Sequence, residues 1–333
     1  MSQRILVTGA AGFIGSWLTE RLLARGDRVV GVDNFDPFYG RAAKERNLSG
    51  AYAYPSFRLV EADCTDPAGL DPALAAEDFD VIVHLAAKAG VRPSIRNPAA
   101  YATANVMGTQ ILLEFARRRG IRRFVLASSS SVYGNNRKIP FAEDDPVIAP
   151  ISPYAATKVA AEVISRTYHH LYGMSIVALR FFTAYGPRQR PDLAIRTFAT
   201  RMLRNETISV FGDGASQRDY TWIDDILAGA LAAIDYTDAV RGTFEVINLG
   251  GNRTTTLQRL ISLLAHALDV EPALDHQPAQ PGDVRRTYAD ITKASRLLGY
   301  APATTIEEGI PRFVAWMLRD HPRATQPRML ALR

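Results

Sequence analysis

The sequence lacks most features that would mark a secreted, membrane-spanning or metal-binding protein. Its 333 residues include one cysteine, Cys64, so no disulfide can form within the chain. No uncharged run approaches the roughly 20 apolar residues that a membrane-spanning helix requires. The six histidines show no spacing typical of zinc ligands, and we expect no metal site. We therefore expect a cytoplasmic protein.

A strong excess of charge of one sign is also missing. Lys and Arg number 39 and Asp and Glu 34, which gives a formal net charge of +5. The cations are scattered, without the stripe of basic and aromatic residues typical of nucleic-acid binding. A small anionic ligand fits this pattern better, and we expect no nucleic-acid partner. The hydrophobic content of 47% predicts a folded globular protein.

Short apolar runs alternate with longer amphipathic segments through the first half of the chain. This alternation predicts an α/β fold with a Rossmann-type, doubly wound parallel sheet covered by helices on both faces. Strands are expected at residues 4–9, 28–33, 57–63, 80–87, 124–130 and 175–182, and long helices at 98–119 and 153–172. We place a Rossmann domain at 1–182, rejoined by 215–255 through a strand at 243–250. Residues 183–333 should mainly form a smaller, interleaved substrate-binding region.

Three glycines lie between the first expected strand and the following helix. Gly9, Gly12 and Gly15 in "GAAGFIG" allow a tight turn and close approach of the backbone to a pyrophosphate, at a helix N-terminus that favours anions. Asp33 ends the next strand, near the spacing of roughly 20 residues expected for a carboxylate on the adenosine ribose. Because this carboxylate would repel a 2′-phosphate, we predict NAD rather than NADP. A glycine-rich turn without a ligand fits this position less well.

A second group of residues lies on the fifth strand and on the helix at 153–172. Tyr154 and Lys158 are four residues apart on one helix face, and we expect the lysine to lower the pKa of the phenol. The run "SSSSVYG", residues 128–134, follows a buried strand, so its hydroxyls should lie at the carboxyl edge of the sheet, where ligands bind. The alternatives are a surface Tyr and Lys pair and a flexible serine linker.

Seven segments together resemble the extended short-chain dehydrogenase/reductase family, and within it the nucleotide-sugar 4-epimerases. They are the glycine loop, "HLAAKAGVR", "SSSSVYG", "SPYAATK", "LRFFTAYGP", "RDYTWIDDI" and "PGDVRRTYAD", spread over residues 4–316. The resemblance implies a catalytic triad of Ser129, Tyr154 and Lys158, an NAD cofactor and a UDP-sugar substrate. It also implies a homodimer formed by the helices at 98–119 and 153–172, although the apolar faces of these helices would also suit simple docking on the sheet.

The resemblance further implies which residues contact each ligand. Around NAD it places Phe13 and Ile14 at the pyrophosphate, Asp33 and Asn34 at the ribose, Asp63 and Cys64 at the adenine, and Ala86, Lys88 and Asn105 along the remaining groove. At the nucleotide diphosphate it places Arg190, Arg218 and Asp283, and arginine suits phosphates because its contacts are bidentate and permanently charged. Cys64 lacks an activating partner, so we expect a packing residue there rather than a reactive thiol.

The residues before "VYG" distinguish three reactions of this family. By resemblance, dehydratases carry an acid and base pair here and glucuronate decarboxylases a glutamate, whereas this chain has Ser130 and Ser131. The missing carboxylate favours simple C4 epimerisation with Tyr154 as the base. A different possibility is an NAD-binding regulator without catalytic activity.

One position in "LRFFTAYGP" concerns the sugar. Thr183 stands where many UDP-glucose and UDP-N-acetylhexosamine 4-epimerases carry Asn, and together with "DNFDPFYG" it resembles UDP-glucuronate 4-epimerases. Oxidation of a glucuronate at C4 makes a β-keto acid, which loses carbon dioxide when its carboxylate bond aligns with the carbonyl. We expect hydroxyls of Ser129, Ser130, Ser131 and Thr183 to hold the carboxylate out of alignment. UDP-glucose or a UDP-N-acetylhexosamine is the alternative substrate.

Overall fold

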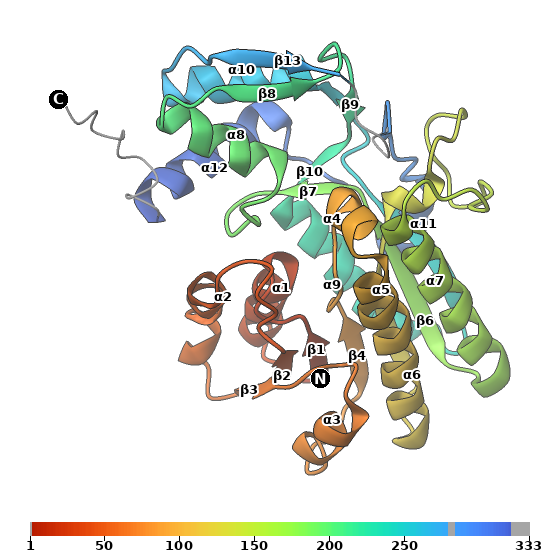
Figure 1. The fold of residues 1–333 in the computed structure, drawn as a ribbon. Helices are drawn as coiled ribbons and strands as arrows, with labels where there is room; N and C mark the ends of the chain where they lie inside the picture. The colour runs from red at the N-terminus through yellow and green to blue at the C-terminus, as the bar shows by residue number, and fades with distance from the viewer. Residues whose placement is uncertain (1, 279–283, 321–333) are drawn as a thin grey trace.

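A seven-stranded parallel sheet forms the centre of the computed structural model, which describes residues 2–278 and 284–320 (Figure 1). Its order is β11-β6-β5-β4-β1-β2-β3. The strands are β1 (Arg4–Thr8), β2 (Arg28–Asp33), β3 (Phe57–Glu61), β4 (Val81–His84), β5 (Arg123–Ser129), β6 (Ser175–Phe181) and β11 (Phe244–Leu249). The order reverses between β1 and β4, which creates a ligand crevice at their carboxyl ends. The predicted doubly wound parallel sheet is confirmed.

Helices cover both faces of the sheet, because its strands are apolar on both sides. Ile5 and Val7 of β1 belong to the core under α1 (Phe13–Ala24) and α9 (Ile223–Ala239). Leu6 belongs to the core under α3 (Pro67–Ala73), α6 (Gly108–Arg118) and α7 (Pro153–Tyr172). Alternate residues of one buried strand thus supply two separate cores. None of the described helices combines the length and apolar character that crossing a membrane requires.

The two long helices predicted from the sequence differ in regularity. α7 occupies the predicted residues; Ser152 caps it by accepting a hydrogen bond from the Ala155 N–H at 3.1 Å, and Gly173 ends it at φ 65°. The helix expected at 98–119 consists of α5 (Pro98–Tyr101), a π-helical segment η2 (Ala102–Met107) and α6. The predicted long helix is therefore present over residues 98–118, with a π-turn inside it of a kind that often lies at functional sites.

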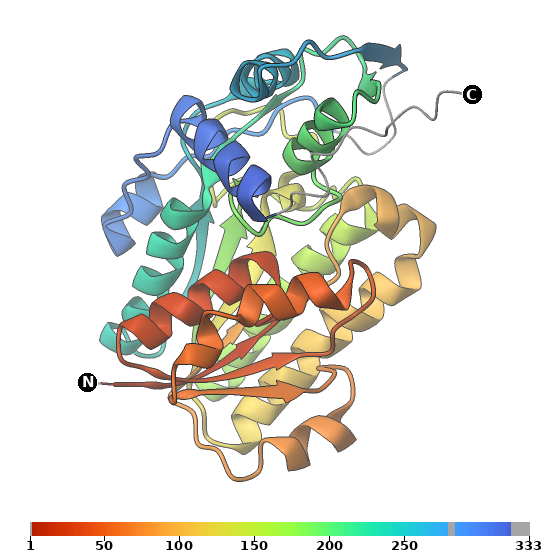
Figure 2. The same cartoon turned by 90° about the vertical axis from the view of Figure 1, so that its left-hand side faces the viewer.

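The rest of the chain lies over the carboxyl ends of the strands (Figure 2). Its elements are β7 (Thr183–Tyr185), α8 (Ala194–Leu203), β8 (Ile208–Phe211), β9 (Gln217–Arg218), β10 (Tyr220–Trp222), β12 (Thr255–Thr256), α10 (Leu257–Leu268), β13 (Leu274–Gln277), α11 (Thr292–Leu298) and α12 (Ile306–Asp320). Shorter helices lie in the connections, namely α2 (Arg41–Leu48), η1 (Ala51–Ala53), α4 (Val91–Arg96) and η3 (Ser130–Tyr133). β11 returns the chain to the sheet beside β6. The domain division at residue 182 stays a prediction.

One buried carboxylate joins this upper region to the sheet. Asp219 is fully buried, and its side chain accepts hydrogen bonds from the N–H groups of Gly251 and Ala289 at 2.6 and 3.1 Å. Its backbone carbonyl accepts a hydrogen bond from the Thr183 N–H at 3.0 Å. Asp219 therefore fixes Thr183 relative to the strand ends, where the candidate site lies.

Candidate active site

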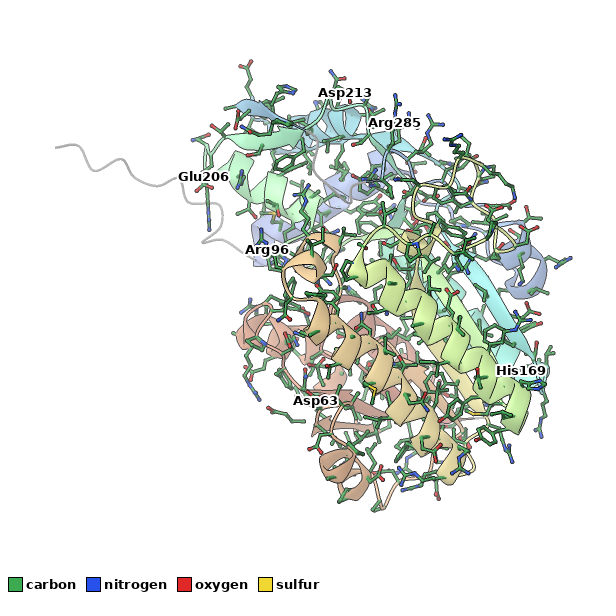
Figure 3. All side chains as sticks on the ribbon, turned by 45° about the vertical axis from the view of Figure 1, so that its right-hand side comes forward. Asp63, Arg96, His169, Glu206, Asp213 and Arg285 are labelled. Atoms are coloured by element: carbon green, nitrogen blue, oxygen red, sulfur yellow. The ribbon has the colours of Figure 1, made fainter. Side chains whose placement is uncertain are left out.

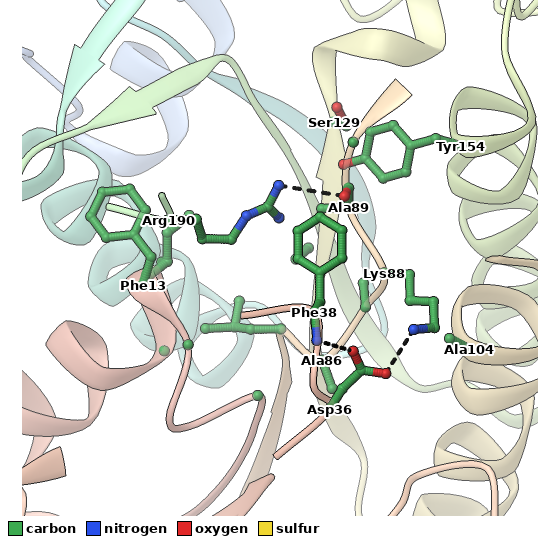
Figure 4. A pocket seen from close by; sticks show the side chains of 18 of the residues that line it. Phe13, Asp36, Phe38, Ala86, Lys88, Ala89, Ala104, Ser129, Tyr154 and Arg190 are labelled. Atoms are coloured by element: carbon green, nitrogen blue, oxygen red, sulfur yellow. Dashed lines mark hydrogen bonds and ion pairs between the residues drawn. The ribbon is translucent and has the colours of Figure 1, made fainter. Parts of the chain in front are cut away.

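A cavity of about 650 Å³ opens at the carboxyl ends of the central strands (Figure 4). Most residues predicted to bind ligands lie in its wall. They are Gly9, Gly12, Phe13, Ile14, Gly15, Asp33, Asn34, Asp63, Cys64, Ala86, Lys88, Ser129, Ser130, Ser131, Tyr154, Lys158, Thr183 and Arg190. Asn105 and Arg218 do not line this cavity, and Asp283 lies outside the described residues.

The glycine loop has a shape that larger residues would block. Gly9 has φ +70°, in the left-handed region, and a Cβ on Gly15 would lie 2.0 Å from the Gly9 carbonyl oxygen. α1 therefore begins directly against the loop at Phe13, and residues of its first turn line the cavity. The first N–H groups of a helix have no partner within the helix. This backbone cradle fits an anionic diphosphate.

Asp33 is engaged through both carboxylate oxygens. Oδ1 accepts hydrogen bonds from Lys44 Nζ at 3.1 Å and the Phe35 N–H at 2.8 Å, and Oδ2 accepts one from the Ala11 N–H at 3.1 Å. The Lys44 and Asp33 side chains are 8% and 5% exposed, so they form a buried ion pair. The charge expected to repel a 2′-phosphate is thus partly neutralised by a lysine that sequence analysis missed.

Further polar contacts order the wall at the ends of β2 and β3. Asn34 Nδ2 donates to Asp63 at 2.8 Å, and Lys88 Nζ donates to Asp36 at 2.7 Å (Figure 4). Burial raises the pKa of the Cys64 thiol to about 12, so the thiol stays protonated at neutral pH. Cys64 is therefore unsuited to nucleophilic chemistry.

Asn105 lies behind the wall rather than in it. This residue of η2 is 1% exposed. Its Oδ1 accepts a hydrogen bond from the Lys88 N–H at 2.8 Å, and its Nδ2 donates to the Lys88 carbonyl at 2.9 Å and to Thr157 Oγ1 at 3.0 Å. Asn105 thus supports the backbone of the wall at Lys88 instead of lining the groove as expected.

A buried histidine connects Asn105 to the end of β1. His84 is 3% exposed; its Nδ1 lies 2.7 Å from Thr8 Oγ1, and its Nε2 lies 3.1 Å from Thr109 Oγ1. Thr109 donates its hydroxyl proton to the Asn105 carbonyl at 2.6 Å. Because that proton is used, His84 Nε2 must donate to Thr109. In a neutral ring, Nδ1 then accepts a hydrogen bond from the Thr8 hydroxyl.

The same chain of hydrogen bonds continues into α7. Thr157 accepts a hydrogen bond from Asn105 and donates its own proton to the Tyr154 carbonyl at 2.7 Å. Burial, with a smaller contribution from the Lys158 charge, lowers the pKa of His84 to about 3 and keeps it neutral. With a neutral His84, every hydrogen bond of this series is thus donated in the same direction, from β1 toward the helix that carries Tyr154. No sequence motif indicates it.

Tyr154, Lys158 and Ser129 meet where α7 packs on the end of β5. Lys158 Nζ donates to the Ala127 carbonyl at 2.7 Å, and burial lowers the pKa of Lys158 to about 8. Burial raises the pKa of Tyr154, while a hydrogen bond with Ser129 and the charge of Arg190 oppose that rise. The expected fall in the pKa of the phenol is therefore wrong, because burial outweighs the polar neighbours.

Several hydroxyl groups share the cavity wall with the Tyr154 phenol. Ser129 Oγ accepts a hydrogen bond from the Ser131 N–H at 3.1 Å, and Ser130, Ser131 and Thr183 line the cavity. The wall's carboxylates, among the described residues, are Asp33, Asp36 and Asp63, which follow β2 and β3. Within the described part of the chain, the wall around Tyr154 is therefore polar without an acid.

Arg190 projects into the cavity from the loop after β7. It donates to Asp192 at 2.8 Å and to the Ala89 carbonyl at 3.4 Å, and its guanidinium lies 5.2 Å from the centre of the Phe38 ring (Figure 4). A cation is thus held across the cavity from Tyr154, where an anionic group of a ligand can meet it.

Arg218, also predicted at the diphosphate, does not line the cavity. Arg218 lies in β9 opposite Thr255 of β12, and its side chain donates to the Gln217 carbonyl at 2.9 Å. Asp283 lies outside the described residues. Of the three, Arg190 alone is brought into the wall of the cavity in the described structure.

Comparisons with known proteins find relatives along nearly the whole chain. The family model described as GDP-mannose 4,6 dehydratase matches residues 6–313. A protein of Thermodesulfobacterium geofontis named UDP-glucuronate 4-epimerase is 40% identical over 312 residues, which cover 93% of this chain and 95% of that protein.

Two solved structures are also similar. UDP-glucuronic acid 4-epimerase from Bacillus cereus, in complex with UDP-glucuronic acid and NAD, has a TM-score of 0.87 at 37% identity, over 96% of this chain and 100% of that one. UDP-glucose 4-epimerase from Thermotoga maritima, with UDP-glucose, has a TM-score of 0.86 at 34% identity, over 95% and 99% of the two chains. The similarity thus extends to structures named for two different sugars.

We predict that the neutral state of His84 makes the protein less stable in acid. An unfolded histidine binds a proton below a pKa of about 6.5, whereas buried His84 does so near 3, so this contribution to stability is lost as the pH falls below 6.5. Between pH 7 and pH 5, the free energy of unfolding should drop by about 2 kcal/mol more in the wild type than in His84→Gln. Urea unfolding at both pH values measures this difference, and equal drops would contradict a neutral His84.

Proposed function

The chain belongs to the extended short-chain dehydrogenase/reductase family, in the group that the GDP-mannose 4,6 dehydratase model matches, and we propose that it is an NAD-dependent UDP-glucuronate 4-epimerase. One observation carries this proposal: Ser129, Tyr154 and Lys158 meet at an end of the cavity whose described wall offers hydroxyls and no acid. The relatives and solved structures support NAD-dependent 4-epimerisation of a UDP-sugar. That the sugar is glucuronate is the more specific part of the proposal.

NAD would lie between the glycine loop and the catalytic group. The loop from Gly9 to Gly15 would hold the pyrophosphate, Asp33 and Asn34 the adenosine ribose, and Asp63 and Cys64 the adenine. When bound, NAD supplies a reversible hydride acceptor for C4 of the sugar. Because Lys44 pairs with Asp33, the preference for NAD is supported by the relatives more than by repulsion of a 2′-phosphate.

The chain's own residues would move the proton of the reaction. Tyr154 accepts the proton of the 4-hydroxyl as C4 is oxidised and returns it when C4 is reduced on its other face. Ser129, hydrogen-bonded to the phenol, shares this proton with the sugar oxygen. Since burial raises the pKa of Tyr154, the phenolate depends on nearby cations. The charge of Arg190 across the cavity opposes that rise, and the family resemblance implies the same role for Lys158 on α7.

The hydroxyls beside the phenol favour epimerisation over the dehydration for which the family model is named. Loss of water at C5 and C6 needs an acid and a base near those atoms, and Ser130 and Ser131 supply neither. For a glucuronate, these serines and Thr183 would bind the carboxylate and hold its bond out of line with the C4 carbonyl. We propose that Arg190 binds the diphosphate of the substrate. The resemblance implies that Arg218 and Asp283 also lie near the diphosphate.

The proposed substrate is tested by incubating the purified protein with UDP-glucuronate, UDP-glucose and UDP-N-acetylglucosamine separately and resolving the products by NMR. We expect UDP-glucuronate to be converted to UDP-galacturonate fastest. Faster conversion of a neutral sugar would favour the alternative substrate, and no turnover of any sugar would favour a regulator.

The proposed base is tested with the same assay. Tyr154→Phe should lower kcat by about 10²–10⁴-fold because the base is lost, while NAD still binds. Tyr52→Phe, an exposed tyrosine, is the matched control.

A second prediction concerns the hydroxyl cluster. The variant Ser130→Ala/Ser131→Ala/Thr183→Val should release carbon dioxide and UDP-pentose from UDP-glucuronate, because the carboxylate is no longer held out of alignment. Thr207→Val removes an exposed hydroxyl that does not line the cavity and should leave the products unchanged. Product ratios from NMR decide the outcome, and a triple variant that forms only UDP-galacturonate would refute the proposed role.

We further propose that two copies of the chain pair through the outer faces of α6 and α7. Figure 3 shows these helices side by side at the surface. Met107, beside the start of α6, is 52% exposed, and Val163 and Leu171 of α7 are 61% and 59% exposed. Two such helix pairs would bury these apolar side chains in a four-helix interface.

Charges placed on this surface should separate the proposed dimer. Met107→Asp/Val163→Asp would bury two carboxylates per copy, so size-exclusion chromatography with light scattering should find the mass of one chain instead of two. Ile148→Asp is the control, because Ile148 is 89% exposed and lies outside α6 and α7. A wild type that elutes as a monomer at micromolar concentration would contradict the dimer.

A further inference from the structure

A buried ion pair lies behind the proposed catalytic lysine. Glu162 is one helical turn beyond Lys158 in α7, and Arg180 lies in β6. Glu162 and Arg180 are 5% and 3% exposed. Arg180 donates from Nε to Oε1 at 2.9 Å and from Nη2 to Oε2 at 2.8 Å, so the pair is bidentate. Neither residue lines the cavity.

Residues 127–129 of β5 meet three residues of α7 that share one helix face. Lys158 donates to the Ala127 carbonyl, and Glu162 accepts a hydrogen bond from the Ser128 hydroxyl. Tyr154 is hydrogen-bonded to Ser129. Glu162 thus extends the spacing of Tyr154 and Lys158 by one more turn of the helix. The carboxylate belongs to the same contact surface as the catalytic pair.

Arg180 is held firmly on its other side. Its guanidinium lies 4.8 Å from the centre of the Tyr133 ring, and the Tyr133 hydroxyl donates to Asn248 at 2.7 Å. A buried ion pair is costly to desolvate and is often no more stabilising than apolar side chains of equal volume. Stability alone is therefore a weak reason for this pair, whereas its charge acts on the neighbouring lysine.

The groups around Lys158 leave Glu162 as the acid that acts on it. Tyr154 faces it from α7, neutral His84 from β4, and Arg180 lies beyond Glu162 in β6. We propose that Glu162 is a positioning residue of the epimerase: it keeps Lys158 in its charged form and fixes the end of β5 against α7. This inference rests on the proposed function.

The electrostatics agree with this role. Burial lowers the pKa of Lys158 to about 8, and the Glu162 carboxylate opposes that fall. Without the carboxylate, a larger share of Lys158 is neutral at pH 8, and the Tyr154 phenolate loses a stabilising cation. Since Glu162 does not line the cavity, its loss should act on kcat and leave KM for the UDP-sugar nearly unchanged.

The test compares wild type, Glu162→Gln and a control, Glu307→Gln, which removes one partner of an exposed ion pair with Arg259. The Lys158 ¹³Cε resonance, assigned through Lys158→Arg, reports the protonation of the lysine, and kcat is measured over the same pH range. In Glu162→Gln we expect the pH midpoint of the Lys158 resonance to decrease by about half a pH unit or more. The alkaline pH at which kcat falls should decrease by the same amount. That shift is about a threefold change in the protonation equilibrium. Glu307→Gln should shift neither.

A second variant keeps the test decisive if Glu162→Gln does not fold. Glu162→Gln/Arg180→Met removes both charges and leaves no unpaired buried cation. It should shift the midpoint and the limb in the same direction but by less, because the repulsion between Arg180 and Lys158 is lost as well. A folded variant with an unchanged midpoint and limb would overturn the inference and assign Glu162 a purely structural role. A wild type that turns over no UDP-sugar would overturn the proposed function instead, while the NMR midpoint would still decide the effect of Glu162 on Lys158.

Discussion

The register of α7 against the end of β5 is the constraint on which the rest of the site depends. Lys158 donates to the Ala127 carbonyl at 2.7 Å, and α7 cannot slide along the strand without leaving this buried ammonium unpaired. With that contact formed, Tyr154 comes level with Ser129 and Glu162 with Ser128. One hydrogen bond between a side chain and the backbone thus aligns the proposed base with its hydroxyl partner.

The cavity keeps its acids away from the end that holds the phenol. All seven strands of the sheet are parallel, so their carboxyl ends share one edge. The wall's acids lie at the ends of β2 and β3, whereas the serines and Thr183 of the wall lie at the ends of β5 and β6. A keto sugar near Ser130 and Ser131 would therefore meet groups that bind it without driving elimination. The matching family model is named for a dehydratase, so the fold does not decide the reaction, and a few side chains beside Tyr154 do.

Sequence patterns predicted the strands of the central sheet, the glycine loop and the helix that carries both Tyr154 and Lys158, because each of these depends on residues close together in the chain. The missed features depend on contacts between distant segments. Lys44 reaches Asp33 from α2, and Asn105, in a π-helical segment without a sequence signature, bonds the Lys88 backbone behind the wall. The rise in the pKa of Tyr154 was missed for the same reason: helical spacing predicts a neighbour but not burial.

The charges of the buried layer behind the phenol form a consistent set. Glu162 and Arg180 form a bidentate ion pair, and burial lowers the pKa of His84 to about 3, so that ring is neutral. The charge of Lys158 itself disfavours protonation of His84, since it contributes to the low pKa of that ring. Because the Glu162 carboxylate is shared with Arg180, it balances the positive charge of Lys158 only in part. A phenolate at Tyr154 would balance the rest of that charge, so the layer as a whole favours the charge state that a base at this position needs.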